Sequence, residues 1–436
     1  MKPVKIGVLG LGTVGGGTVN VLTRNAEEIA RRAGREIIVS RASARNLTQS
    51  RICDTQNIAL TADPFDIVND PDIDIVVELI GGYDLAKQLV LTAIANGKHV
   101  VTANKALIAL HGNQIFAEAS KKGVMVMFEA AVAGGIPIIK AIREGLSGNR
   151  INWLAGIING TGNFILTEMR DKGRDFADVL AEAQALGYAE ADPTFDVEGI
   201  DAGHKLTILA SIAFGIPLQF EKIFTEGITQ ITRADVGYAE ELGYRIKHLG
   251  IARKTAQGIE LRVHPTLIPK RRLIANVNGV MNAVLVCGDA VGPTLYYGAG
   301  AGAEPTASAV VADLVDVVRA MTSDPENRVP HLAFQANAIV DIPVLSADNI
   351  KTAYYLRLTA EDKPGVLADV TRILAAHQIS IEALIQKEPQ RGESSVPIIM
   401  LTQLTLEKEM NAAIAEIEAL NTVSGKVARI RLETLG

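Results

Sequence analysis

Cysteine, tryptophan and aromatic residues are scarce in this chain of 436 residues. Its two cysteines, Cys53 and Cys287, are too few for a disulfide framework and have no CxxC spacing, so a reducing compartment is expected. A single tryptophan and an aromatic content of 4% do not favour a protein that stacks nucleic-acid bases. The net charge of -6 also argues against a polyanionic partner.

Long uncharged apolar runs are lacking too. The most apolar stretch, residues 124–139, contains Glu129 and Pro137, so it does not read as a membrane span. The apolar run near the N-terminus is not followed by a small-residue cleavage site. The sequence therefore predicts a cytoplasmic protein of two or three domains, with no membrane or nucleic-acid partner.

Strand-like runs are expected at residues 4–9, 37–40, 73–79, 99–102 and 124–128 and alternate with helical runs, which predicts an α/β fold. We expect a doubly wound, Rossmann-type parallel sheet over residues 1–135, joined by a returning helix near 304–325. An α+β domain for substrate binding and dimerisation is expected over 136–303. The order of strands and helices over 350–436 is βαββαβ, which predicts a ferredoxin-like unit.

A glycine-rich turn follows the first strand and opens a helix, the setting that a dinucleotide fingerprint requires. It consists of Gly10, Leu11, Gly12, Thr13, Val14 and Gly15. The end of the second strand offers Arg41 and Arg45 in place of the carboxylate that binds the ribose of NAD. NADP is therefore favoured, with NAD possible if these arginines are ordinary surface residues.

Five carboxylates lie within residues 187–205, just ahead of an apolar helical pattern. Asp201 and Lys205 are four residues apart, so on a helix a carboxylate could hold and aim an ammonium group. The alternative is a solvated acidic loop with an ordinary ion pair.

The pattern from Ala183 onward, Ala-x3-Gly-Tyr-Ala-x2-Asp-Pro-x2-Asp-Val-x-Gly-x-Asp-x3-Lys, resembles the active-site segment of homoserine dehydrogenases. The resemblance covers essentially the whole chain and implies the monofunctional form. It implies interconversion of L-homoserine and L-aspartate 4-semialdehyde with NAD(P), in the biosynthesis of threonine, methionine and isoleucine. Lys205 is then the acid/base, and Asp201 orients its ammonium group or binds substrate.

The same resemblance implies roles for further residues. Lys105, in Thr102-Ala-Asn-Lys, would lie near nicotinamide and substrate, and Asn159-Gly-Thr-Gly-Asn163 would line the same cleft. Glu190 would bind the substrate's amino group. The other substrate-binding residues would be Gly187, Tyr188 and Asp196, and Gly302 would join the cofactor site.

Residues 129–136 resemble a family site for a monovalent cation such as Na+. The expected ligands are Glu129, Val132, Gly134 and Ile136, through one carboxylate and backbone carbonyls, since oxygen ligands suit such ions. A plain exit from strand to loop is the alternative reading.

Residues 362–365, Asp-Lys-Pro-Gly, resemble the ligand-binding turn of ACT regulatory domains, with Ile379 and Ser380 on the strand opening that faces it. Backbone N–H groups at a helix start suit the carboxylate of an amino acid, and threonine is the expected effector. We expect a homodimer or homotetramer. The alternative is a purely structural dimerisation module.

Two other enzymes and one non-enzyme compete with this reading. Phosphoglycerate dehydrogenase also carries an ACT domain, but its fingerprint lies mid-chain. Aspartate-semialdehyde dehydrogenase needs a cysteine nucleophile, and neither cysteine lies in a suitable setting. A non-catalytic amino-acid sensor would not need Lys105, Glu190, Asp201 and Lys205 together.

Overall fold

The computed structural model describes residues 2–387 and 395–436. These residues form two compact units, each built from three stretches of chain. The first holds residues up to Leu154, His204–Glu221 and Met281–Ile342, and the second holds Ala155–Gly203, Lys222–Val280 and Pro343–Gly436. The strand β7 (Ile151–Ile157) and the helix α10 (Ile200–Phe214) carry the chain from one unit to the other. The three-domain division with its boundaries stays a prediction.

The first unit contains a six-stranded sheet with the order β3-β2-β1-β4-β5-β6, in which every pairing is parallel. This is the order of a doubly wound nucleotide-binding fold, so the predicted fold class is confirmed. The strands are β1 (Val4–Leu9), β2 (Ile37–Ser43), β3 (Ala59–Thr61), β4 (Ile75–Glu78), β5 (His99–Thr102) and β6 (Val126–Met127). The helices between them are α1 (Thr13–Arg24), α2 (Ala26–Ala33), α3 (Phe65–Val68), α4 (Asp84–Ala95) and α5 (Lys105–Lys122).

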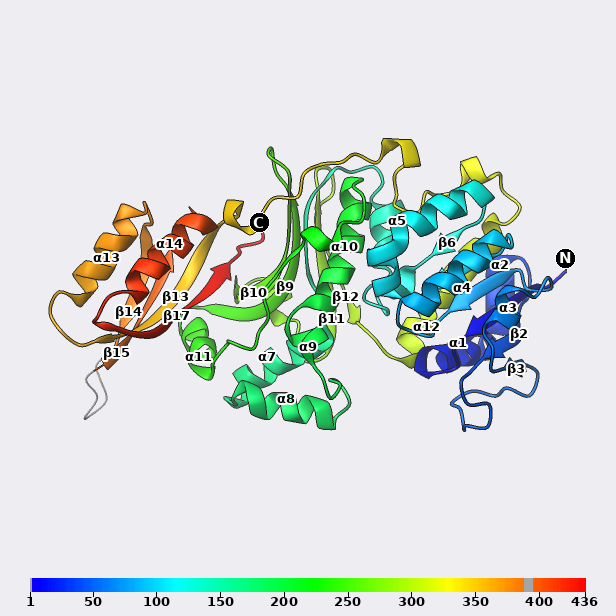
Figure 1. Ribbon diagram of the computed structural model, residues 1–436, viewed down its shortest axis with the longest axis horizontal. Coiled ribbons are helices and arrows are strands. Elements are labelled where there is room, and N and C mark those ends of the chain that lie inside the picture. The colour runs from blue at the N-terminus through cyan, green and yellow to red at the C-terminus, as the bar shows by residue number, and fades with distance from the viewer. Residues whose placement is uncertain (1, 388–394) are drawn as a thin grey trace. The chain divides into compact units, whose positions relative to one another are not determined.

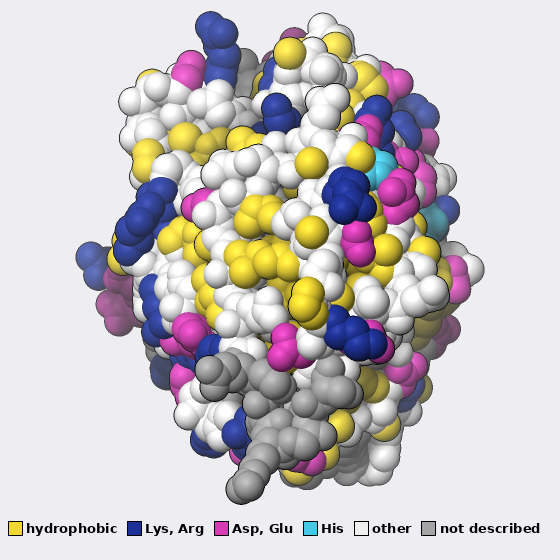
Figure 2. All heavy atoms as spheres, turned by 90° about the vertical axis from the view of Figure 1, so that its left-hand side faces the viewer, with side chains coloured by type: hydrophobic (Ala, Val, Ile, Leu, Met, Phe, Trp, Pro, Cys, Tyr) yellow, Lys and Arg dark blue, Asp and Glu magenta, His cyan; other side chains and the backbone are white. Residues whose placement is uncertain are grey.

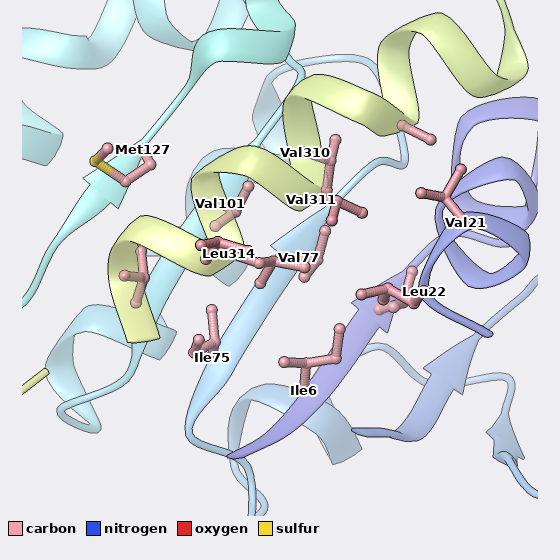
Figure 3. Packing of buried hydrophobic residues seen from close by; sticks show 14 of the residues in the cluster. Ile6, Val21, Leu22, Ile75, Val77, Val101, Met127, Val310, Val311 and Leu314 are labelled. Atoms are coloured by element: carbon pink, nitrogen blue, oxygen red, sulfur yellow. The ribbon is translucent and has the colours of Figure 1, made fainter. Parts of the chain in front are cut away.

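One face of this sheet is covered by α1, α2 and the late helix α12 (Ala303–Ala320). Figure 3 shows Val310 and Leu314 of α12 lying over Ile75 and Val77 of the sheet. These residues are fully buried, because alternate side chains of a parallel strand point toward the same covering helices. The unit also holds α6 (Ile138–Lys140) and the antiparallel hairpin β11 (Met281–Gly288) and β12 (Gly292–Ala299).

The second unit is organised around strands in the order β9-β10-β17-β13-β15-β14, with β8 beside β10 and β16 beside β13. They are β8 (Phe224–Thr225), β9 (Tyr244–Lys254), β10 (Ile259–Pro269), β13 (Lys351–Glu361), β14 (Ile381–Gln386), β15 (Ser395–Thr402), β16 (Thr405–Leu406) and β17 (Val423–Leu432). The helices are α7 (Gly160–Lys172), α8 (Phe176–Ala185), α9 (Thr194–Val197), α11 (Arg233–Glu241), α13 (Val366–Ala376) and α14 (Glu407–Glu418).

The last four long strands and two helices have the βαββαβ order that the sequence predicts (Figure 1). This part is not an isolated module, because β17 pairs in parallel with β10 at Thr266 and Leu267. One face of its sheet packs against α13 and α14, and the other face packs against α7, α8 and α11. The core of the C-terminal part is therefore continuous with that of residues 164–267. No helix among the described residues is long and apolar enough to cross a membrane.

Candidate active site

The glycine turn of the first unit has the backbone that its sequence predicts. Gly10 has φ +96°, and a Cβ there would lie 2.9 Å from the carbonyl oxygen of Leu79. A Cβ at Gly15 would collide with the carbonyl of Gly10, whereas Gly12 has no atom within 4 Å of its Cβ position. Gly12 is the N-cap of α1 and brings no side-chain cap, so the helix start is open to an anion.

Gly302 lies close to this helix. It is the N-cap of α12 with φ +135°, and a Cβ at Gly17 of α1 would lie 2.5 Å from the carbonyl oxygen of Ala303. The absence of a side chain at Gly17 therefore lets the starts of α1 and α12 approach each other. The structure thus brings Gly302 beside the nucleotide-binding helix.

The two arginines expected near the ribose are placed differently. The strand β2 runs to Ser43, whose carbonyl accepts a hydrogen bond of 3.1 Å from Gly10 N. Arg41 therefore lies inside the strand, and its guanidinium donates to Asp70 Oδ2 at 2.9 Å. Arg45 is exposed, two residues past the strand end. Both stay candidates for a 2′-phosphate, and Arg45 is the one that lies outside the strand.

The carboxyl edge of the sheet is held by a buried carboxylate that the sequence analysis missed. Glu78 ends β4 and is fully buried. Its carboxylate accepts a hydrogen bond of 2.6 Å from Thr102 Oγ1 and one of 3.0 Å from the N–H of Ile80. Burial raises the pKa of Glu78. Asn104 caps α5 by accepting from Leu107 N at 3.0 Å, and Lys105 is the first residue of that helix, half-buried. The sequence signal that could have identified Glu78 is its place as an acidic residue at the end of an apolar strand.

In the second unit, Asn159 joins two acids of the segment 187–205. Its Nδ2 donates to Asp196 Oδ1 at 2.7 Å and to Asp201 Oδ2 at 2.9 Å. Its Oδ1 accepts from Gly162 N at 2.7 Å, so the same side chain caps α7. Asp201 is only 4% exposed and Asp196 is half-buried. The residue expected merely to line the cleft therefore fixes the positions of two carboxylates.

The other end of the Asn159–Asn163 turn is held by a buried lysine that the sequence analysis did not single out. Lys247 Nζ donates to Asn163 Oδ1 at 3.1 Å and to the carbonyl of Val277 at 2.5 Å. Burial, followed by the charges of Arg170 and Arg245, lowers the pKa of Lys247 to about 7. No local pattern could have revealed it, because these contacts span 84 and 30 residues.

Three of the residues expected to bind substrate, Gly187, Tyr188 and Glu190, lie on a surface segment before α9, and the fourth, Asp196, lies on α9 itself. Gly187 has φ +73°, and the carbonyl of Tyr188 accepts from Thr161 Oγ1 at 2.6 Å. The Tyr188 ring stands edge-on to Phe164, with 5.1 Å between ring centroids. Glu190 is exposed, and its carbonyl accepts from Gln184 at 3.0 Å. The carboxylate of Glu190 is therefore open to solvent while its backbone is tied.

Asp201 and Lys205 both lie on α10, one turn apart, as the spacing predicts. The helix begins directly after Gly199, whose φ is +83° and whose Cβ position is only 3.0 Å from Val263. That glycine allows the tight turn between α9 and α10. Asp201 stands in the first turn of α10, where the positive end of the helix favours a carboxylate.

Glu129 is buried but its carboxylate is already engaged. Oε1 accepts from Ile139 N at 2.9 Å, and Oε2 accepts from Lys140 N at 2.8 Å. Burial and the nearby Asp313 raise the pKa of Glu129 to about 7. Ala133 has φ +48°, a turn in which successive carbonyls face different ways. Each carboxylate oxygen keeps a further lone pair, so Glu129 stays an expected cation ligand together with the carbonyls of Val132, Gly134 and Ile136.

The turn at residues 362–365, where an effector is expected to bind, is exposed. Gly365 has φ +98° and is the N-cap of α13, with no side-chain cap. Asp362 is exposed beside it. Ser380 is exposed as well, whereas Ile379 is 4% exposed and packs in the core of this part.

Together, the parallel sheet, the uncapped glycine turn and the lysine after β5 define a class of protein, the nicotinamide-nucleotide-dependent oxidoreductases with an appended α/β unit. Comparisons with known proteins agree. A model of the NAD-binding domain of homoserine dehydrogenase matches residues 10–129, one of homoserine dehydrogenase matches 137–315, and one of the ACT domain matches 354–421.

Whole relatives match over the full length. The chain is 71% identical over 435 residues to the homoserine dehydrogenase of Pseudomonas aeruginosa and 59% identical over 436 residues to that of Neisseria gonorrhoeae, with 100% of each chain covered. A crystal structure of a homoserine dehydrogenase from Thiobacillus denitrificans superposes with a TM-score of 0.95 at 71% identity, covering 100% of this chain and 99% of that one.

An archaeal homoserine dehydrogenase in complex with NADPH is more distant, with a TM-score of 0.62, 26% identity and coverage of 72% of this chain and 98% of that one. The chain belongs to the homoserine dehydrogenase family. Its reaction is the reversible NAD(P)-dependent interconversion of L-homoserine and L-aspartate 4-semialdehyde.

Proposed function

We propose that Lys205 carries the proton of this reaction and that Asp201 orients its ammonium group from one turn earlier on α10. Bound NAD(P) supplies or accepts the hydride. Lys205 then donates a proton to the substrate oxygen when the aldehyde is reduced, and removes one when the alcohol is oxidised. The observation that supports this assignment best is the pair of hydrogen bonds by which Asn159 fixes Asp201 and Asp196. Lys105 is the second catalytic lysine.

Substrate recognition falls to α9 and the segment before it. Glu190, whose carboxylate is exposed, lies before α9 and binds the substrate's ammonium group, and Asp196, held by Asn159, lies on α9 itself. Gly187 and Tyr188 shape the backbone beside them.

Replacing Lys205 by methionine tests the proton-transfer role while keeping the apolar length of the side chain. We expect kcat to fall by about a hundredfold to ten-thousandfold, the usual range for a lost general acid/base. NADPH binding, followed by fluorescence of the reduced nicotinamide, should be unchanged. Lys121→Met, on the exposed end of α5, is the matched control. Near-normal turnover of a folded Lys205→Met variant would remove this lysine from the mechanism.

The cofactor that we propose is NADP, with Arg45 as the residue nearest the expected 2′-phosphate and Arg41 in a lesser role because it is paired with Asp70. The end of β2 carries no carboxylate to bind the ribose of NAD, which favours NADP, and NAD would be usable if both arginines act only as surface residues. A monovalent cation such as Na+ would be held by the carboxylate of Glu129 and the main-chain oxygens of Val132, Gly134 and Ile136.

We propose threonine as an end-product effector of the ACT part, bound at Asp362 and Gly365, where the uncapped start of α13 suits a carboxylate. Ser380 is exposed and available to the same ligand, while the buried Ile379 supports the turn. Truncation is an unsound test because the C-terminal part shares a core with the rest of the unit. Its removal would take away Tyr355 and Ile430 and expose the apolar residues of β10 and α7 that pack in the same core. Point variants of the full chain are needed.

A homodimer or homotetramer in the cytoplasm is the assembly that we propose. Figure 2 shows hydrophobic side chains gathered in the middle of one face, with charged side chains around them. In Figure 1 this is the side of α13, β14 and β15. Leu384 and Leu404 are the large hydrophobic residues of the described C-terminal part that are more than a third exposed, at 39% and 64%. Such a patch favours contact with a second copy.

A further inference from the structure

Glu78 is a buried carboxylate to which the proposed reaction assigns no role. It ends β4, and Thr102 ends the neighbouring strand β5 in the paired position. Figure 3 shows the residues just before them, Val77 and Val101, in the core beneath α12. Because alternate side chains of a strand point to opposite faces, Glu78 and Thr102 lie together on the face away from α12, and both are fully buried.

Two donors point at the Glu78 carboxylate. Thr102 Oγ1 donates to one oxygen at 2.6 Å, and the N–H of Ile80 donates to the other at 3.0 Å. Burial raises the pKa of Glu78, because an ionised carboxylate is costly to bury. A neutral side chain could end this strand without that cost. A carboxylate kept at the edge where doubly wound sheets bind their ligands is therefore a candidate for a functional role.

Thr102 passes the contact on to α5. Its Oγ1 accepts from the N–H of Asn104 at 3.0 Å. The side chain of Asn104 caps α5 and donates to the carbonyl of Gly82 at 2.5 Å. Since Lys105 is the first residue of α5, the chain of hydrogen bonds that starts at Glu78 ends beside this lysine.

The loop between β4 and α4 is held at two points by the same network. Glu78 binds the N–H of Ile80, and Asn104 binds the carbonyl of Gly82, whose φ is +69°. The loop also packs on the glycine turn, since a Cβ at Gly10 would lie 3.0 Å from the side chain of Ile80. It therefore links the expected pyrophosphate site to the start of α5.

We propose that Glu78 is a positioning residue for the reaction: through Thr102 and Asn104 it fixes the first turn of α5 and the loop 80–82 against the glycine turn. Glu78 acts through these neighbours, and the network holds Lys105 at one place relative to the cofactor turn. The effect on turnover rests on the proposed catalytic role of Lys105. A displaced catalytic group slows the chemical step, whereas an intact glycine turn keeps its affinity for the cofactor.

Two variants of Thr102 separate the hydrogen bond from packing. Thr102→Val keeps the shape of the side chain and removes the hydroxyl, whereas Thr102→Ser keeps the hydroxyl and removes a methyl group. We expect Thr102→Val to lower kcat for homoserine oxidation about tenfold or more, and Thr102→Ser to stay within about threefold of the wild type. The Kd for NADPH should change less than about threefold in both. Thr61→Val is the matched control, since Thr61 also ends a strand, β3, and donates to Asp66 at 2.6 Å; it should keep the wild-type kcat.

Glu78→Gln tests the carboxylate itself. Glutamine offers one acceptor oxygen where Thr102 and Ile80 each donate to one, so one of these hydrogen bonds is lost or reversed. We expect a loss in kcat of about tenfold. The double variant Glu78→Gln/Thr102→Val should lose no more kcat than the weaker of the two single variants, because both break the same chain of bonds.

Hydrogen exchange of peptides that cover residues 79–107, followed by mass spectrometry, reads the network independently of turnover. Exchange should be faster in Glu78→Gln and Thr102→Val but not in Thr102→Ser. Circular dichroism and the unfolding midpoint establish that each variant is folded, and the Thr102 pair carries the test if Glu78→Gln is not. Wild-type kcat in Thr102→Val, or a greater loss in Thr102→Ser than in Thr102→Val, would overturn the proposal and leave Thr102 a packing role.

Lys105→Met separates this proposal from the catalytic role on which it rests. Near-normal kcat in Lys105→Met, with faster exchange in Glu78→Gln, would refute the role of Lys105 and leave the network standing. A large loss in Lys105→Met, with wild-type exchange and kcat in Glu78→Gln, would refute the role of Glu78 alone.

Discussion

Replacement of Asn159 gives the sharpest test of how the acidic segment is held. Its amide donates to Asp196 and Asp201, and its carbonyl oxygen caps α7 by accepting from Gly162 N. Alanine removes all three hydrogen bonds. Aspartate keeps an acceptor for the cap but removes the donors and adds a third carboxylate beside two others.

The size of the effect follows from those bonds. Loss of an N-cap costs about 1 kcal/mol. A hydrogen bond to a charged partner contributes about 1.5–3 kcal/mol, and Asp201, at 4% exposure, would be left without this donor. We therefore expect Asn159→Ala to lower the free energy of unfolding by about 4 kcal/mol. This is the low end of the range that the cap and the two hydrogen bonds give together, because Asp196 is partly solvated.

Asn159→Asp should behave differently with pH. Two neighbouring carboxylates raise the pKa of the new carboxyl group in the folded state above its unfolded value of about 3.9. Stability relative to the wild type is then greatest below the unfolded pKa and is lost as pH rises through the folded pKa. The variant should thus be closest to the wild type below about pH 4 and weakest at about pH 8.

Urea unfolding at acid and neutral pH measures this, and absorbance of reduced nicotinamide during homoserine oxidation gives kcat. Both variants should lose at least about tenfold in kcat, because Asp201 loses its hydrogen bond from Asn159; tenfold corresponds to about 1.4 kcal/mol. Asn113→Ala is a matched control, since among the described residues this asparagine bonds to the neutral backbone of Leu218. A wild-type free energy of unfolding for Asn159→Asp at neutral pH would refute the reasoning.

Three further outcomes are expected. Arg45→Ala should lower kcat/KM for NADP by about tenfold and leave that for NAD unchanged, whereas Arg41→Ala should do little; better use of NAD by the wild type would contradict this. Burial alone would raise the pKa of Asp235, but its bonds to Arg357 hold that pKa below the ordinary value. Asp235→Asn should therefore cost about 3 kcal/mol at neutral pH, a cost that shrinks as acid protonates the wild-type carboxylate, and equal urea midpoints would argue against the pair. Because the folded pKa of Lys247, about 7, lies below its unfolded value, stability relative to Lys247→Met should rise with pH from about 7 to 10 by about 1.4 kcal/mol per unit; a flat difference would show that the lysine stays charged.

The sequence predicted well wherever the signal was local. Strand β5, residues His99–Thr102, has the predicted bounds, because a short apolar run between helical patterns allows little else. The turn at Gly10 also follows from local sterics, since only glycine tolerates its positive φ and its approach to Leu79. Asp201 and Lys205 lie on one helix because their spacing falls inside a strong apolar period.

Strand β9 was not predicted, for a physical reason. Its residues Tyr244–Lys254 include Lys247 and Arg253, whose charges mask an otherwise apolar pattern. Lys247 is buried against the carbonyl of Val277, and Arg253 pairs with Glu433 at 2.8 Å. Partners so distant in sequence leave no local pattern, so the burial of these cations could not be foreseen.

The position of Arg41 shows how a small error in a strand boundary changes an inference. The predicted strand ended at Ser40, which would leave Arg41 in the ligand-binding loop. In the structure β2 continues to Ser43, so Arg41 is a strand residue that faces Asp70. An extension of three residues therefore shifts the expected 2′-phosphate contact to Arg45.

The C-terminal part illustrates a different gap, because its βαββαβ order was predictable but its attachment was not. Arg357 of β13 holds Asp235 at the start of α11, and Arg429 of β17 holds Glu226 after β8. Between these two anchors runs the loop that packs on Val197 through Ile228. Since α9 also carries Asp196, a displacement of the ACT sheet would be transmitted to the Asn159 cluster through bonded neighbours rather than across a flexible linker. Regulation of the acidic segment would then need no large movement, because a shift of either ion pair would disturb the bonds that orient its carboxylates.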